Sequence, residues 1–272
     1  MATLKKVSLK ALKFLSIAIL WILVWAICAW AMNLPILFPS PFDVIKRFFE
    51  IFFTKEFFLI TGSSLYRVFS GIIIGILIGS ILAVICSMSR IVYDIFYPII
   101  TVIKSTPIAS FVLLIWLFMG DQITPIIITI IMVLPIVWAN IYQGINSIDK
   151  NLIEVCKIYK IPVKKRISAF YVPSLMPFFI SSLLSGIGLA WKAGIAAEVL
   201  CSTKRSMGEE IWNAKYDLER AVDLYAWTLA VILISLIFEI VFSKLIKKLL
   251  NKYVKSTGGS HENWNYQKSL QG

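Results

Sequence analysis

The residues of this chain best placed to do chemistry are charged side chains that interrupt long apolar stretches. Lys192 stands inside such a stretch, and Glu198 follows six residues later. An ionisable group within a membrane span costs about 2.5–3.5 kcal/mol on insertion scales, so Lys192 is expected to face a bundle interior or water. A lysine in that position would offer a positive field to an anionic or polar molecule.

Two structural alternatives for Lys192 stay open. It could form an ion pair with an acid elsewhere in the bundle, or it could lie at a shallow position near the outer surface. Glu198 is a poor partner within one helix, because residues six apart do not share a helical face. The residues alone do not decide among these interpretations.

A basic segment between two apolar runs is the second candidate site. Its apolar residues recur at helical spacing, at Ile148, Leu152, Val155, Cys156 and Tyr159. Asp149 is expected to cap a first helix, and Pro162 to end it near Lys160. A second short helix over Lys164–Tyr171 would lead to Pro173. Such a hairpin suits docking on a cytosolic protein or resting on anionic lipid headgroups, and periodicity leaves both open.

The sequence shows no cluster of cysteines, histidines or carboxylates that would indicate a metal site or a hydrolytic active site. The four cysteines are scattered, the single histidine, His261, lies in a polar tail, and the acids Asp94, Asp121 and Asp223 stand apart at span ends. The sequence has no GxxxxGK(S/T) phosphate loop, so no nucleotide site of that kind is expected in this chain. We therefore expect no cofactor in this chain.

The elements that position these residues are expected to be membrane-spanning helices. The chain is 59% hydrophobic and 15% charged, whereas soluble domains are about a quarter charged. Backbone polar groups in lipid must be paired within their own segment, which favours helices. The sequence therefore predicts an all-α, polytopic membrane protein. Runs long enough for about 30 Å of hydrocarbon predict about six spans: Phe14–Met32, Val68–Met88, Ser105–Gly120, Ile123–Ser147, a span starting near Leu175, and Leu224–Ser243.

Two of these spans carry distinctive residues. The third is preceded by Lys104, which would snorkel from a position near the cytosolic edge, and it contains Pro107. The second has Gly71, Gly75 and Gly79 on one face, a spacing that lets helices approach closely. The glycine face is expected to serve packing rather than contact with solute.

The net charge of +12 indicates orientation rather than nucleic-acid binding, because the basic residues lie mostly at the ends of apolar runs. With the N-terminus inside, the cytosolic segments hold 17 basic residues and the outer segments seven, so both termini are expected in the cytosol. The first run resembles a signal peptide, but its length and tryptophans favour an uncleaved helix. One transmembrane domain is expected over residues 1–255, with a polar cytosolic tail over 256–272.

Several motifs resemble those of a known family. Glu154-Val155-Cys156, with Pro173 nineteen residues after the glutamate, resembles the EAA loop of permeases in binding-protein-dependent ABC importers. Four further stretches resemble the nitrate/sulfonate/taurine branch of that family: Phe38-Pro39-Ser40-Pro41, Leu65-Tyr66-Arg67-Val68, Thr106-Pro107, and Gly188-Leu189-Ala190-Trp191 leading to Ala196-Ala197-Glu198. The resemblance covers roughly residues 35–250, in the family's order and spacing.

The resemblance implies a permease of the type I ABC importer kind in a prokaryotic plasma (inner) membrane. Such a permease pairs with a second copy and seats its EAA loops in a cytosolic ABC ATPase dimer, which binds and hydrolyses ATP with Mg²⁺. An extracytoplasmic binding protein delivers a small polar or anionic solute of the nitrate, sulfonate or taurine kind. By position, the coupling residues are Glu154, Val155, Cys156, Lys157, Tyr159, Lys160, Pro162 and Pro173, and the solute path takes Thr106, Trp191, Lys192 and Glu198. The loop departs from the family at Val155 and Cys156, which replace alanines, and at Lys160, which replaces a glycine. Pro162 could provide the turn instead.

Two other classes explain less of the sequence. A stand-alone secondary transporter or channel would account for the spans, yet no inverted repeat is visible and few buried acids are available to bind a coupling ion. A membrane-embedded enzyme would need carboxylates, histidines or cysteines clustered at helical spacing. The ABC permease is therefore the main prediction, and the secondary transporter or channel is the alternative.

Overall fold

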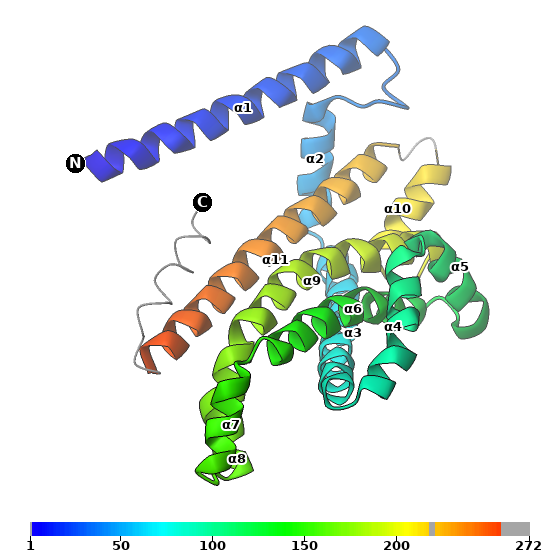
Figure 1. Ribbon diagram of the computed structural model, residues 1–272. Helices are drawn as coiled ribbons and strands as arrows, with labels where there is room; N and C mark the ends of the chain where they lie inside the picture. The colour runs from blue at the N-terminus through cyan, green and yellow to red at the C-terminus, as the bar shows by residue number, and fades with distance from the viewer. Residues whose placement is uncertain (1, 218–220, 257–272) are drawn as a thin grey trace. The chain divides into compact units, whose positions relative to one another are not determined.

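The computed structural model describes residues 2–217 and 221–256, and every regular element within these ranges is a helix (Figure 1). The predicted all-α fold is confirmed. The chain forms two compact units, one from residues up to Ser64 with residues 202–232, and one from residues 65–201 with residues from 233 onward. The single domain expected over 1–255 stays a prediction, and the predicted tail lies outside the described residues beyond Ser256.

The membrane-spanning character of the chain is confirmed. Four helices in the described ranges are long and apolar enough to cross a bilayer: Lys55–Met88, Thr124–Asn146, Val163–Cys201 and Ala221–Ile246. A fifth crossing exists if the bent pair Arg90–Ser105 and Ile108–Met119 forms one span. The first predicted span lies in helix α1 (Ala2–Met32), whose apolar part Ser16–Met32 is shorter than those four. Six as a count therefore stays a prediction.

The third predicted span is not one straight helix. Helix α4 (Arg90–Ser105) and helix α5 (Ile108–Met119) meet at Thr106-Pro107 with a bend of 106°. The residue before a proline avoids helical backbone, and Thr106 is accordingly extended. Its hydroxyl and its N–H both donate to the Val102 carbonyl, at 2.7 and 3.0 Å, which closes α4. With 12 residues, about 18 Å, α5 is too short to cross a bilayer alone.

The first unit contains a short helix, α2 (Pro41–Phe52), between α1 and α3 (Lys55–Met88). Ser40 caps α2, because its Oγ accepts the N–H of Asp43 at 3.3 Å. Pro41 takes the first helical position, where a missing N–H costs nothing. The Ser-Pro pair thus sets where α2 begins.

An ion pair and a ring stack join the elements of the first unit. On α2, Arg47 donates through Nε to Asp223 Oδ1 of α11 (Ala221–Ser256) at 2.5 Å, and through Nη1 to Glu50 at 3.0 Å. The bonds to Asp223 and then Glu50 raise the pKa of Arg47 above its ordinary value, so the guanidinium stays charged. Phe57 of α3 stacks on Trp227 of α11 with ring centroids 5.5 Å apart.

The second unit is built around close contacts of α3 with α6 (Thr124–Asn146). A Cβ added at Gly71 would lie 2.5 Å from the Cβ of Thr129, and one at Gly79 would lie 2.9 Å from the Leu134 carbonyl oxygen. Gly75 faces α6 in the same way. The predicted packing role of this glycine face is therefore confirmed.

Helix α9 (Val172–Cys201) lies beside α6. An aromatic cluster formed by rings of α9, α3 and α11 joins these three helices. The ring of Phe238 is 5.7 Å from Trp191, 5.0 Å from Phe69 and 4.6 Å from Phe242, centroid to centroid. Trp191 is 1% exposed. The cluster packs against the part of α9 that holds Trp191, Lys192 and Glu198, three of the four predicted path residues.

Candidate functional site

The segment predicted to form a hairpin does so. Helix α7 (Lys150–Ile158) follows Asp149, whose carboxylate accepts the N–H of Asn151 at 2.9 Å, so the predicted cap is confirmed. The chain then turns into α8 (Val163–Arg166) and a π-helical segment, η1 (Ile167–Tyr171), which continues into α9. Figure 1 shows the hairpin projecting beyond the adjoining ends of α6 and α9.

Lys160 makes the turn of the hairpin. Its φ of +49° lies in the left-handed region. The N–H of Ile161 donates to the carbonyl of Cys156 at 3.0 Å, a closure that usually follows a glycine at the position of Lys160. Lys160 therefore adopts a backbone conformation that glycine takes without strain, at a cost of about 1 kcal/mol for a residue with a Cβ. Pro162, expected to provide the turn, instead starts the second arm.

The second arm differs from the predicted helix over Lys164–Tyr171. Only Val163–Arg166 is α-helical, and η1 carries one wider turn into α9. Helix α9 begins at Val172, so Pro173 lies in its first turn and the expected start near Leu175 is three residues late. The Arg166 Nε donates to the Ile161 carbonyl at 2.9 Å, which ties this arm to the turn.

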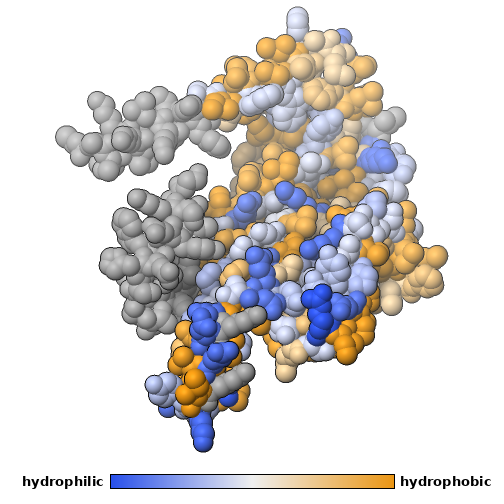
Figure 2. Space-filling view, viewed as in Figure 1, coloured by the Kyte–Doolittle hydropathy of each residue, from blue (hydrophilic) through white to orange (hydrophobic). Residues whose placement is uncertain are grey.

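The tip of the hairpin exposes large apolar side chains. Ile158 and Tyr159 are each 76% exposed and Val163 is 61% exposed. Figure 2 shows hydrophobic and hydrophilic side chains next to one another on the hairpin. An exposed apolar patch with a charged border is typical of a contact surface for another molecule. We call the set Ile158, Tyr159 and Val163 the hairpin tip.

The predicted coupling residues divide between two faces of the hairpin. Glu154 and Lys160 are exposed, and Val155 is 48% exposed. Cys156 is 3% exposed and packs inward, so the apolar stripe drawn from the sequence does not point in one direction. The side chain of Lys157 lies outside the described residues.

A buried ion pair forms the second candidate site. The Arg67 Nη1 on α3 lies 3.3 Å from the Glu198 Oε1 on α9, and the Arg67 Nη2 donates to the Gln122 Oε1 at 2.7 Å. The side chains of Arg67 and Glu198 are 9% and 0% exposed. A buried charge pair is stable only if both members stay paired and hydrogen-bonded. Glu198, predicted to line the solute path, is thus held by a cation 131 residues away in the sequence.

The remaining path residues are not brought together. Lys192 is exposed on α9, and no carboxylate among the described side chains pairs with it. Trp191 lies in the aromatic cluster, and Thr106 is half-buried at the bend between α4 and α5. Lys192 stands 20 residues along α9 from Val172, about 30 Å at 1.5 Å per residue. The path residues on α9 and the hairpin therefore belong to different ends of this helix.

Arg67 and Gln122 are the site residues that the sequence reasoning missed. Arg67 stood in the stretch Leu65-Tyr66-Arg67-Val68 and Glu198 in Ala196-Ala197-Glu198, two motifs that were recognised separately. A buried acid in an apolar helix needs a cation or hydrogen-bond donor, so this requirement was the signal that could have joined them.

The known proteins that resemble this chain are permease subunits of transport systems. The model of the family "Binding-protein-dependent transport system inner membrane component" matches residues 71–255, more than half of the chain. A nitrate import permease of Synechococcus elongatus is 28% identical over 191 residues, which are 65% of this chain and 67% of that protein. A bicarbonate transport system permease from the same organism is 26% identical over 161 residues, 59% of this chain and 58% of the relative.

A candidate aliphatic sulfonates transport permease of Bacillus subtilis is 23% identical over 178 residues, 65% of this chain and 64% of the relative. The chain thus spans 58–67% of the length of these relatives. The resemblance to ABC permeases of the nitrate/sulfonate branch is confirmed by these matches. The chain belongs to the family of inner membrane components of binding-protein-dependent transport systems.

Proposed function

We propose that this chain is the membrane-spanning permease subunit of an ATP-driven importer of small polar anions. A cytosolic ABC ATPase dimer grips the hairpin, a second copy of the chain completes the translocation path, and an extracytoplasmic binding protein delivers the solute. Family membership, the apolar helices and the exposed hairpin tip support this assignment. Both termini lie in the cytosol, an orientation supported by the excess of basic residues in the segments on the side of the hairpin.

The hairpin tip carries the proposal. Three large apolar side chains are exposed at a turn that the Ile161–Cys156 backbone bond closes, and the hairpin that carries them projects beyond the adjoining ends of α6 and α9 (Figure 1). Because α9 follows η1 without a loop, a displacement of the hairpin tip would be passed on to that helix. An ATPase that moves the tip during its cycle would therefore move the helix that carries Lys192 and Glu198.

Loss of one tip side chain tests the docking role. Tyr159→Ala removes a ring that is 76% exposed, and aromatic anchors at interfaces contribute about 2 kcal/mol or more, roughly 30-fold in Kd. We expect the purified variant to lose a stoichiometric ATPase that accompanies the wild type in mild detergent. The control Tyr216→Ala makes the same change at a 65% exposed tyrosine on α10 (Met207–Tyr216) and should retain it. Equal ATPase retention by both variants would contradict the docking role.

The solute class rests on the relatives and on Lys192. The three relatives are named for nitrate, bicarbonate and aliphatic sulfonates, which are all anions. In one protomer Lys192 is exposed on a helix of the second unit, where a second copy would place two ammonium groups along the path. Each would attract an anion without a bidentate grip, which suits solutes of different shapes.

Substitution of Lys192 tests the anion path. Lys192→Met keeps the length of the side chain and removes its charge, so uptake of the transported anion into proteoliposomes is expected to fall at unchanged expression. Lys192→Arg should restore most of the rate, because it restores the charge. If Lys192→Met leaves the uptake rate and the affinity for the anion unchanged, Lys192 does not act in the path, but the permease assignment still holds. Solute uptake by the purified chain without ATP would instead favour a stand-alone secondary transporter.

A further inference from the structure

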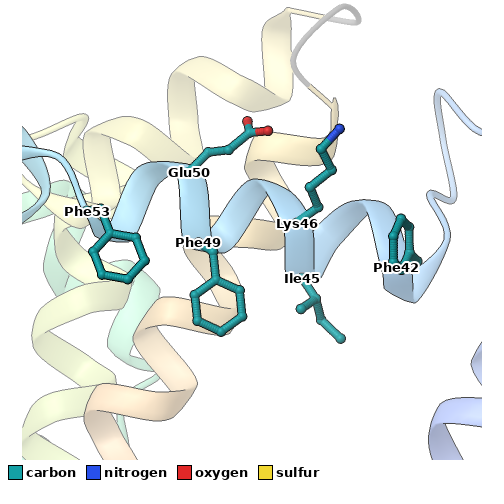
Figure 3. Close-up of a pocket in the computed structure, with 6 residues that line it drawn as sticks. All are labelled: Phe42, Ile45, Lys46, Phe49, Glu50 and Phe53. Atoms are coloured by element: carbon teal, nitrogen blue, oxygen red, sulfur yellow. The ribbon is translucent and has the colours of Figure 1, made fainter.

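Helix α2 presents an exposed apolar stripe on one side. We call it the α2 stripe, and it consists of Phe42, Ile45, Phe49 and Phe53 at the end of the helix. Phe42 and Phe53 are 75% and 77% exposed, and Phe49 is 51% exposed. The stripe borders an open groove of about 560 Å³ together with Lys46 and Glu50. In Figure 3, Ile45, Phe49 and Phe53 point to one side of the helix and Lys46 and Glu50 to the other.

The circumference of α2 has three sectors. At about 100° per residue, the four side chains of the stripe fall within an arc of roughly 80°. A second sector holds Val44, which is 0% exposed and packs within the unit. The third sector is polar and carries Lys46 and Glu50, with Asp43 and Arg47 beyond them. An apolar stripe beside one polar sector is the pattern of a helix that lies in a membrane–water interface.

The position of α2 in the chain keeps it at a membrane surface. Only Phe53 and Thr54 separate it from α3, whose apolar stretch crosses the bilayer. With 12 residues, about 18 Å, α2 cannot cross about 30 Å of hydrocarbon itself. The exposed apolar surface continues past the helix, because Phe58 and Leu59 in the first turns of α3 are 60% and 63% exposed.

A second copy of the chain is a poor occupant for the stripe alone. Fully buried aromatic side chains contribute about 150–250 Å² each, so four partly exposed residues offer on the order of 450 Å². A stable protein interface buries about 800 Å² on each partner. The stripe also has no hydrogen-bonding group, which suits acyl chains because they offer none.

We propose that the α2 stripe inserts into the acyl-chain border of the bilayer, making α2 an interfacial anchor between α1 and α3. Phe42, Phe49 and Phe53 lie among the lipid chains, while Lys46 reaches back to the headgroups along its apolar stem. The polar sector faces water, and Arg47 keeps α2 joined to α11 through Asp223. The anchor holds the entrance of α3 at a fixed depth. This inference does not depend on the solute or on the ATPase.

Spin labelling of the full-length chain in vesicles tests the anchor. Cys28 is the exposed cysteine and the other three are buried, so a Cys28→Ala chain provides the background. Phe49→Cys and Phe53→Cys place a nitroxide in the stripe, and Glu50→Cys places one in the polar sector of the same helix. Each protein is reconstituted into phosphatidylcholine/phosphatidylglycerol vesicles, and collision of the nitroxide with oxygen and with a water-soluble nickel chelate is measured by electron paramagnetic resonance.

The expected result has opposite signs at neighbouring residues. Oxygen concentrates in lipid, so its collision rate should exceed that of the nickel chelate several-fold at positions 49 and 53, with the reverse at position 50. High nickel collision at positions 49 and 53 would place the stripe in water and overturn the proposal. Low collision with both reagents would show that protein covers the stripe, which would overturn it equally. Agreement between the two stripe positions guards against a local distortion by either substitution.

Discussion

The Arg67–Glu198 pair makes the sharpest stability prediction. Glu198→Gln removes the negative charge from a side chain that is 0% exposed and that pairs with Arg67, which also donates to the Gln122 Oε1 at 2.7 Å. The substitution keeps the size of the side chain, so it creates no cavity. Its effect therefore reports the charge of the pair rather than packing.

The expected cost follows from the burial of both partners. Removing one member of a buried ion pair destabilises proteins by about 3–5 kcal/mol, because the other charge is left uncompensated. The new amide can still accept one bond from Arg67, which puts Glu198→Gln near the low end, about 3 kcal/mol, or a factor of roughly 150 in the unfolding equilibrium. Replacing both charges, as Arg67→Met with Glu198→Leu, should return the protein to within about 1 kcal/mol of the wild type.

Unfolding by titration with a denaturing detergent in mixed micelles measures these differences. The matched control is Asp94→Asn in the Arg90–Asp94 pair, which is 3.2 Å long with side chains 78% and 58% exposed. Exposed pairs contribute about 0–1 kcal/mol, so the control should change little. A cost below about 1 kcal/mol for Glu198→Gln, or a double variant whose loss equals the sum of the two single losses, would refute the reasoning.

Three further substitutions probe the packing and the hairpin. Lys160→Gly should raise the free energy of unfolding of the purified chain by about 1 kcal/mol, because glycine adopts the left-handed backbone without strain. A lower free energy of unfolding would show that the lysine side chain is needed there. Gly71→Ala should lower the free energy of unfolding in detergent by about 1–3 kcal/mol, because the new Cβ would meet Thr129. The control Gly188→Ala meets nothing within 4 Å and should not destabilise the chain. Equal destabilisation by both substitutions would contradict the close α3–α6 contact. Phe238→Ala should cost about 1.5–4.5 kcal/mol, because the ring loses three aromatic contacts of about 0.5–1.5 kcal/mol each. A cost below about 1 kcal/mol in detergent unfolding would contradict a stabilising role of the cluster.

The spanning helices could be predicted because the hydrocarbon core of a bilayer disfavours charged side chains along the whole length of a span. Runs without charge gave α6 to within one residue at each end, and the glycine spacing on α3 gave its tight face. The bend at Thr106 could not be placed from the same rule. Pro107 indicates that a helix is interrupted, but its 106° angle depends on what α4 and α5 pack against.

The candidate sites were predictable only where the determinant was local. Asp149 as a cap follows from the chemistry of neighbouring residues. The left-handed conformation of Lys160 runs against the preference of lysine and is held by the bond from Ile161 to Cys156. The partner of Glu198 lies 131 residues away, and only the folded helices show that Arg67 meets it.

Photo-crosslinking at the hairpin tip tests the central claim, that a separate ATPase grips this hairpin. A benzophenone amino acid in place of Tyr159 is activated by light in intact cells, and the products are identified by mass spectrometry. The proposed function predicts one dominant adduct, with a protein that carries a nucleotide-binding phosphate loop, and the same probe in place of Tyr216 should not form it. Adducts at position 159 with lipid alone, or with proteins outside the cytosol, would contradict the claim.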